Sequence, residues 1–177
     1  MDTAAFVISQ ATNSDIPKLV QLVNNAYRGE QAKKGWTHEA DLIDGALRID
    51  DMAMENLLLN PCAAIFKCNL HSSELAGCVY LEIQGNKTYL GMLSVPAVLQ
   101  GKGIGKALLE AGESFARQNR CSLVEMTVIS VRHELIAWYK KRGYVDTGMT
   151  KPFREHKRFG IPKVPVEFIV MHKELKY

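Results

Sequence analysis

The sequence predicts a single α/β domain, in which a mixed and mostly antiparallel sheet carries helices on both faces. Two observations support this fold class. Apolar, strand-like runs follow one another in the middle of the chain, and helical and strand-like segments alternate after residue 100. The chain has 177 residues, of which 47% are hydrophobic, so it can bury one core of ordinary size. No linker, repeat or low-complexity segment divides it, and we expect one domain over residues 1–177.

The N-terminal third begins with a strand-like run and a capped helix. Thr12 and Asp15 are typical of a helix start, and apolar residues then recur at helical spacing as far as Tyr27. The segments expected here, in chain order, are a strand at 6–11, a helix at 16–27, a polar loop at 28–37, a second helix after Thr37 and a short helix at 51–59.

The rest of the chain alternates more regularly. Three strand-like runs separated by short polar turns predict an antiparallel meander, and β-α-β-α-β alternation follows it. The expected segments are strands at 63–68, 75–83 and 88–95, a helix from 105 to 118, a strand at 123–130, a helix at 133–141, and strands at 144–149 and 166–173.

A glycine-rich turn lies between the third meander strand and the following helix. Gly101, Gly103 and Gly105 remove side chains from the point where the helix begins. Main-chain N–H groups and the positive end of the helix dipole then face outward, which suits a diphosphate anion. Lys102 and Lys106 add positive charge there. We therefore expect residues 101–106, Ile104 included, to bind a phosphate-bearing cofactor.

Two common phosphate-binding loops do not fit this register. A Walker A loop needs Gly at position 100 and Ser or Thr at position 107, where this chain has Gln100 and Ala107. A Rossmann fingerprint needs one more residue between its last two glycines and lies in a first βαβ unit. A nucleotide-phosphate binder such as a small kinase is therefore disfavoured.

The pattern Gln100, Gly103 and Gly105 resembles the pyrophosphate loop of the GCN5-related N-acetyltransferases (GNAT). The segment at 137–144, with sequence AWYKKRGY, is similar to the closing helix and turn of that family. The resemblance implies the GNAT fold and an acetyl-CoA-dependent N-acetyltransferase, with acetyl-CoA as co-substrate. Such an enzyme would act by direct attack of a primary amine on acetyl-CoA within a ternary complex, and the amine would belong to a small molecule or a peptide. A non-catalytic acyl-CoA-binding or sensing module is the alternative. Homodimers are common in the family, so a second copy is one expected partner.

The resemblance also assigns roles to residues of this chain. Main-chain groups around Leu93, Ser94 and Val95 would pair with the pantetheine arm and polarise the acetyl oxygen, and Gln100 would brace the loop. Arg132 stands where family members often carry a pantetheine-binding Asn. Tyr139 is the expected general acid, because a phenol with a pKa near 10 can protonate a departing thiolate of similar basicity.

The general base and the acceptor contacts rest on weaker patterns. Glu125 and Glu82 are candidate bases, because carboxylates within central strands are costly unless they are paired or used. An aromatic and acidic cluster suits a cationic amine; its members are Tyr27, Trp36, Glu39 and Asp41. Thr37 with acids behind it also fits a helix cap. Phe153 and His156 are further candidates for closing the acceptor site.

Composition excludes several other classes. The formal net charge of +3 gives no basic stripe for nucleic acid, and no apolar run approaches the roughly 20 residues that span a bilayer. The N-terminus lacks the features of a signal peptide. The cysteines have no metal-ligand spacing and read as reduced thiols, so we expect a cytoplasmic protein without a metal; they are Cys62, Cys68, Cys78 and Cys121.

Overall fold

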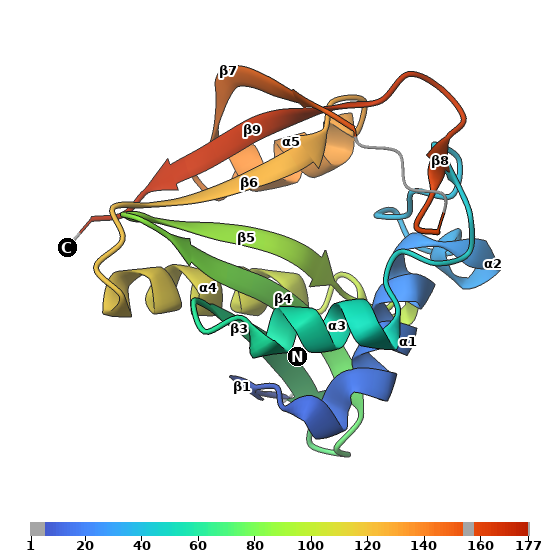
Figure 1. The fold of residues 1–177 in the computed structure, drawn as a ribbon, viewed down its shortest axis with the longest axis horizontal. Coiled ribbons are helices and arrows are strands. Elements are labelled where there is room, and N and C mark those ends of the chain that lie inside the picture. Colours follow the sequence, from blue (N-terminus) through green and yellow to red (C-terminus); the bar gives the residue numbers. More distant parts are fainter. Residues whose placement is uncertain (1–5, 154–157, 177) are drawn as a thin grey trace.

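A computed structural model of the protein describes residues 6–153 and 158–176. Its centre is a seven-stranded sheet with the strand order β1-β3-β4-β5-β6-β9-β7, and a separate small sheet pairs β2 with β8 (Figure 1). Neighbouring strands of the large sheet are antiparallel except β5 and β6, which are parallel. The predicted α/β fold with a mixed, mostly antiparallel sheet is confirmed.

The first helical segment starts at the predicted cap, and the third helix starts at Asp50, a cap that was not predicted. Asp15 accepts a hydrogen bond from the main-chain N–H of Thr12 at 2.8 Å, and Asp50 accepts one from Ala53 N–H at 2.8 Å at the start of the third helix. The elements are β1 (Phe6–Gln10), a 3-10 turn (Asn13–Asp15), α1 (Ile16–Tyr27), α2 (Gly29–Ala32), β2 (Ile43–Asp44) and α3 (Asp51–Leu59).

The prediction of a helix after Thr37 is wrong. Residues 37–42 form turns, and β2 pairs with β8 (Ile161–Pro162), far away in the sequence. Ile43 is buried in this pairing, and the main-chain N–H of Lys163 donates to Leu42 at 2.8 Å. Of the apolar residues that suggested a helical face, Ile43 is thus buried by long-range strand pairing, whereas Leu47 is exposed, so the pairing outweighs a weak local preference.

The meander is present as predicted, with longer strands. Between β4 and β5 the register shifts where Cys78 pairs with Ser94 and Tyr80 with Gly91, so β5 holds an extra residue and Met92 takes a φ of +53°. This bulge reorients the main chain at the end of β5. The strands are β3 (Ala63–Leu70), β4 (Leu75–Gln84) and β5 (Lys87–Ser94).

The C-terminal half also follows the predicted order. The strand after the last helix runs longer than expected, because it stays paired with the final strand through Pro152. The remaining elements of this half are α4 (Ile104–Gln118), β6 (Leu123–Ile129), α5 (His133–Lys140), β7 (Val145–Pro152) and β9 (Glu167–Glu174).

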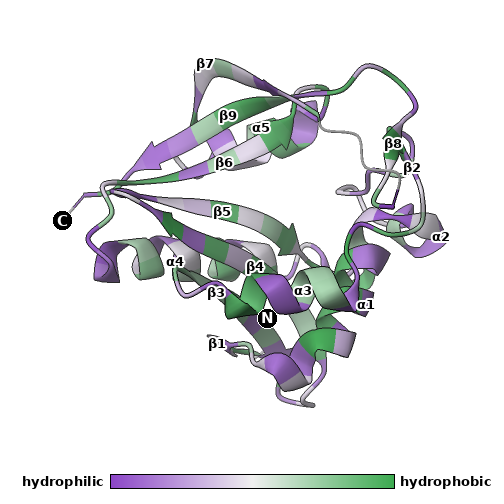
Figure 2. Ribbon diagram, in the orientation of Figure 1, coloured by the Kyte–Doolittle hydropathy of each residue, from purple (hydrophilic) through white to green (hydrophobic). Residues whose placement is uncertain are grey.

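Hydrophobic cores lie on both faces of the sheet. Leu81 packs in the core that α4 and α5 cover, and its neighbour Tyr80 packs in the core beneath α1 and α3. Figure 2 shows hydrophobic and hydrophilic residues interleaved along α1 and α3, as helices with one buried side require. Each fully buried leucine, such as Leu19 or Leu108, contributes about 1.5–3 kcal/mol. Within the described part of the chain, no helix is long and apolar enough to cross a bilayer.

The sheet opens between its two parallel strands. β5 and β6 pair only at Lys87–Leu123, Thr88–Val124 and Tyr89–Glu125. Beyond this point the two strands diverge (Figure 1), and β6 continues along β9. From Leu90 onward, β5 therefore has no strand on its β6 side among the described residues. The N-terminus of α4 follows a few residues after this free edge.

Candidate active site

Two cavities meet near the open ends of β5 and β6. The first has a volume of about 250 Å³ and is lined by the glycine turn, the end of β5 and α5. The second, of about 130 Å³, is lined by β5, the facing part of β6 and residues from the N-terminal third. Tyr27, Leu93, Leu135 and Tyr139 line both. The arrangement can hold two ligands that meet at this shared wall.

The glycine turn forms an open main-chain surface at the start of α4. Gly101 and Gly103 have φ values of +78° and +84°, a left-handed conformation that favours glycine. A Cβ at either position would have no atom within 4 Å, so the space above the turn is free. The first helical hydrogen bond comes from Ala107 N–H to Gly103 O at 3.0 Å. The amides before it, from Ile104 to Lys106, lack intrahelical acceptors and suit an anion.

Gln100 connects this turn to the N-terminal third. Its side-chain amide donates to Thr37 Oγ1 at 2.9 Å and to Val95 O at 3.3 Å, and its oxygen accepts from Trp36 N–H at 3.3 Å. The close approach explains Gly35, where a Cβ would lie 3.0 Å from the Gln100 amide. Gln100 thus holds three segments together beside the first cavity.

The basic residues around the turn are arranged unequally. Lys106 lines the first cavity, with its Nζ 3.7 Å from Glu110, whereas Lys102 is exposed outside both cavities. Arg142 also lines the first cavity, a position that we did not predict although it lies in the basic turn of the second motif. Its guanidinium lies 3.6 Å from the Trp138 ring centroid. Burial lowers the pKa of Arg142.

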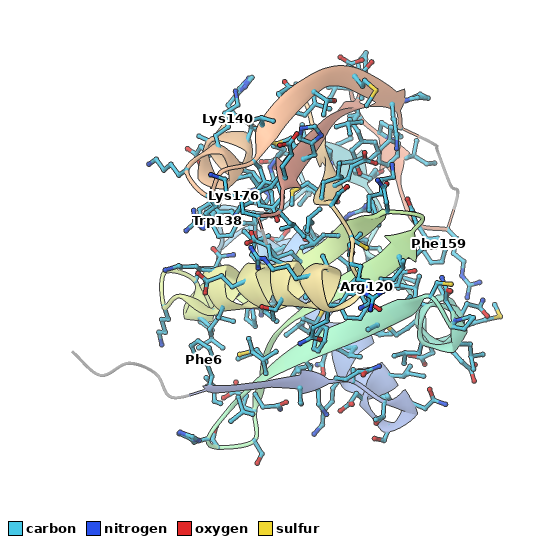
Figure 3. All side chains as sticks on the ribbon, turned by 90° about the vertical axis from the view of Figure 1, so that its left-hand side faces the viewer. Phe6, Arg120, Trp138, Lys140, Phe159 and Lys176 are labelled. Carbon is cyan, nitrogen blue, oxygen red and sulfur yellow. The ribbon has the colours of Figure 1, made fainter. Side chains whose placement is uncertain are left out.

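The end of β5 faces the first cavity through Leu93 and Val95. Ser94, between them, is buried and lines neither cavity, and its Oγ donates to Met92 O at 3.0 Å. Trp138 packs against the first turn of α4, since a Cβ on Gly105 would meet its ring at 3.6 Å. Figure 3 shows Trp138 on the side of α5 that faces α4, whereas Lys140 points outward.

Tyr139 lies at the junction of the two cavities and is only 6% exposed. Its ring packs edge-on against Trp138 and Tyr144, with centroids 5.0 Å and 5.8 Å apart. Burial, together with the nearby Tyr27 phenol, raises the pKa of Tyr139 well above its usual value. The side chain is therefore protonated at neutral pH.

The two predicted bases lie outside both cavities. Glu125 sits where β5 and β6 are still paired and accepts a 2.8 Å hydrogen bond from Lys87. Glu82 accepts from Asn60 at 3.3 Å and from Gln84 at 3.2 Å. Of the carboxylates in residues 6–153 and 158–176, Glu39 alone lines a cavity, namely the second.

The four predicted acceptor residues are distributed over different places. Tyr27 and Glu39 line the second cavity, and the buried Glu39 carboxylate is 3.4 Å from Arg28 Nε. Trp36 lines the first cavity instead, with its ring centroid 6.5 Å from that of Trp138. Asp41 is exposed and lines neither.

Phe153, which follows β7, contacts one residue that lines the second cavity. Phe153 stacks on Phe168 at 5.6 Å, and Phe168 lines the second cavity. His156, the other residue expected to close the acceptor site, lies outside the described residues.

Two arginines line the second cavity. Arg132, predicted to contact the cofactor, lies here and donates to Trp36 O at 3.3 Å. Burial lowers the pKa of Arg132. Arg48 was not predicted, because it lies in an irregular stretch without a motif; its guanidinium carbon is 3.7 Å from the Tyr27 ring centroid.

Comparisons with known proteins identify the family and support the fold. The model of the acetyltransferase (GNAT) family matches residues 21–144. YdhI of Bacillus subtilis, an uncharacterised protein, is 28% identical over 134 residues, which are 76% of each chain. Among solved structures, the ribosomal-protein-S18-alanine N-acetyltransferase of Escherichia coli has a TM-score of 0.72 at 14% identity, with 98% of this chain and 96% of that one covered.

A second similar solved structure is that of an enzyme named for a different substrate. The spermidine/spermine N-acetyltransferase SpeG of Vibrio cholerae has a TM-score of 0.67 at 14% identity, with 96% and 93% of the two chains covered. At such identities these likenesses concern the fold. The family match, which spans most of the chain, goes further. The chain therefore belongs to the acetyltransferase (GNAT) family.

Proposed function

We propose that this protein transfers the acetyl group of acetyl-CoA to a primary amine by direct attack in a ternary complex. The observation that carries the proposal is the free edge of β5 beside the open glycine turn. An extended ligand can add to such an edge through main-chain hydrogen bonds. Its diphosphate can then reach the unpaired amides that begin α4.

The first cavity is the proposed site of the cofactor. Main-chain N–H groups from Gly101 to Lys106 would hold the diphosphate, and Lys106 and Arg142 would add charge at the rim. The main chain around Leu93 and Val95 would pair with the pantetheine arm and polarise the thioester carbonyl. Donors that are fixed before the substrate arrives stabilise developing charge without reorganising.

Tyr139 is the proposed general acid. It touches both cavities, so it lies where the thiolate would depart and the amine would attack. The phenol is protonated at neutral pH, which a proton donor to the leaving sulfur needs, although burial raises its pKa and makes it a weaker acid than a free phenol. This role rests on the position and protonation of one hydroxyl group.

For the general base we propose Glu39 in place of Glu125 and Glu82. Glu39 lines the second cavity, where it also lies beside Arg28, whereas the other two carboxylates line neither cavity. An ammonium group must lose a proton before it attacks a thioester, and a carboxylate in the same cavity can accept that proton directly or through water.

The test is release of free thiol when the protein is incubated with acetyl-CoA and a panel of amines. We expect turnover, and Tyr139→Phe should lower kcat by about 10²- to 10⁴-fold, the usual worth of a general acid, while the Kd for CoA is kept. Tight CoA binding without turnover on any amine would instead favour the acyl-CoA-sensing module. No CoA binding would refute both.

A further inference from the structure

The second cavity has a charge composition that the proposed reaction does not explain. Arg48 and Arg132 both line it, and Glu39 is its one carboxylate among the described residues. A cavity for a polyamine would be expected to carry acidic groups in excess, because like charges repel. Here the cationic side chains are in excess.

Arg48 is held in place and only partly satisfied. Its main-chain N–H donates to Asn24 Oδ1 at 2.7 Å, and its guanidinium lies over the Tyr27 ring at 3.7 Å. Its Nη1 is buried and has no hydrogen-bond partner among the described residues. A buried N–H group without an acceptor costs about 1–3 kcal/mol, and more when it is charged, so a ligand that supplies one gains affinity.

The carboxylate of Glu39 does not neutralise both arginines. It is 3.4 Å from the Nε of Arg28, a third arginine, which is 4% exposed. Arg132 donates to the neutral main-chain oxygen of Trp36. Within the part of the chain that the structure describes, neither Arg48 nor Arg132 forms a salt bridge with a carboxylate. Among the described residues, the charge of the single carboxylate Glu39 thus acts on Arg28, Arg48 and Arg132 together, so this wall of the cavity keeps an excess of positive charge.

We propose that the second cavity takes an acceptor that carries a carboxylate beside its amine, such as a free amino acid, and that Arg48 binds this carboxylate with Arg132 nearby. This inference rests on the proposed function. A guanidinium presents a planar pair of donors that match the two oxygens of a carboxylate. The small volume of the cavity, about 130 Å³, agrees with a small acceptor. The amine is then directed to the wall shared with Leu93 and Tyr139.

The experiment compares acceptors that differ only in the carboxylate. L-Phenylalanine is paired with phenethylamine, L-methionine with 3-(methylthio)propylamine, and L-lysine with cadaverine, and acetyl transfer is followed by thiol release. In at least one pair we expect kcat/KM to be about 10- to 100-fold higher for the amino acid, as a hydrogen bond to a charged group is worth about 1.5–3 kcal/mol. Higher kcat/KM for the decarboxylated member in every reactive pair would overturn the inference and leave the acetyltransferase intact.

Arg48→Met tests the residue itself. It removes the charge and keeps a side chain of similar length, and it should abolish the preference for the amino acid. Arg132→Met should weaken the preference for the amino acid, and it provides a second test if Arg48→Met fails to fold. Arg120→Met is the matched control, since Arg120 is exposed in the turn after α4 (Figure 3) and lines neither cavity. An undiminished preference in both cavity variants would refute the assignment.

A binding readout separates this inference from the proposed activity. In thermal-shift assays with CoA present, N-acetyl amino acids should raise the Tm of the wild type, and the matching N-acetyl amines should not. This result would support the carboxylate site even if thiol release failed on every acceptor, which would refute only the enzymatic proposal. Equal shifts from both members of each pair, or none from either, would overturn the site.

Discussion

The hydroxyl group of Tyr27 donates a hydrogen bond to the main-chain carbonyl oxygen of Leu93. Tyr27 is the last residue of α1, and Leu93 lies on β5 beyond the point where β5 leaves β6. The bond therefore fixes the end of a helix against the free strand edge. Because both residues line both cavities, it stands between the two proposed ligands.

Tyr27→Phe should weaken both stability and catalysis. The variant leaves a Leu93 carbonyl oxygen without its partner, which costs about 1–3 kcal/mol where water cannot replace it. We expect the free energy of unfolding to fall by this amount in urea titrations. We also expect kcat/KM to fall about tenfold, because the strand edge loses its hydrogen bond to α1, while the phenyl ring still lies beneath the Arg48 guanidinium.

Tyr80→Phe is the control for that variant. Tyr80 is also a buried tyrosine, but it lines neither cavity, and its hydroxyl accepts a hydrogen bond from the side-chain amide of Asn60 at 3.4 Å. Its replacement should leave kcat/KM unchanged. Equal losses of activity in the two variants would show that the bond to Leu93 has no role at the site.

Gly103→Leu should prevent CoA binding while the fold survives. A non-glycine residue at a φ of +84° costs roughly 1–2 kcal/mol, which a domain of this size tolerates. The new side chain would occupy the open space above the amides that begin α4. We expect the Kd for CoA, measured by calorimetry, to rise by at least about 100-fold.

Gly85→Leu is the control that separates the backbone strain of such a substitution from a steric block of the CoA site. Gly85, in the turn between β4 and β5, has a φ of +67° and equally open surroundings, yet it is remote from both cavities. Its replacement should lower Tm by a similar amount and leave CoA affinity intact. If Gly103→Leu bound CoA normally, the glycine turn would lose its proposed role.

Gln100→Ala should loosen the loop that precedes the glycine turn. The change removes the contacts to Thr37, Val95 and Trp36 at once. We expect KM for acetyl-CoA to rise, and amide hydrogen exchange to increase over residues 35–37. Gln84→Ala, which removes an exposed contact to Glu82, is the matched control and should change neither quantity. Unchanged exchange over residues 35–37 would contradict the bracing role.

Local patterns predicted the order of the elements along the chain and the glycine turn because both depend on short-range chemistry. Strand alternation, the glycines before α4 and the cap at Thr12 act within a few residues of sequence. The helix wrongly predicted after Thr37 shows the limit of local patterns, because β2 pairs with β8, which lies more than a hundred residues later in the chain.

The candidate site was predictable where a motif carried it. The position of Tyr139 came from its resemblance to a closing segment, and the open turn came from glycine spacing. Arg48 had no such signal: its place depends on Asn24 and Tyr27, which α1 brings to it. The sequence likewise could not show which carboxylate lines a cavity among Glu39, Glu82 and Glu125. The answer depends on the point at which β5 and β6 separate, which is set by the three-dimensional fold.

Tyr139 should make the stability of the protein fall at alkaline pH. A tyrosine in the unfolded chain has a pKa of about 10, and burial raises the pKa of Tyr139 in the folded state. Above pH 10 the unfolded chain binds fewer protons than the folded one, so the unfolding free energy decreases as pH rises. The stabilisation is complete below about pH 10 and is lost toward the folded-state pKa, at about 1.4 kcal/mol per pH unit for one group.

Urea titrations of the wild type and Tyr139→Phe between pH 8 and 12 would measure this contribution. Tyr144 and Tyr80, whose pKa burial also raises (that of Tyr80 to about 12), remain in both proteins, so both curves should fall. The wild-type curve should be steeper above pH 10 by about 1.4 kcal/mol per pH unit. Parallel curves would mean that Tyr139 titrates like an exposed phenol. The wild-type kcat should then also show an alkaline decline near pH 10, which a buried acid with a raised pKa does not give.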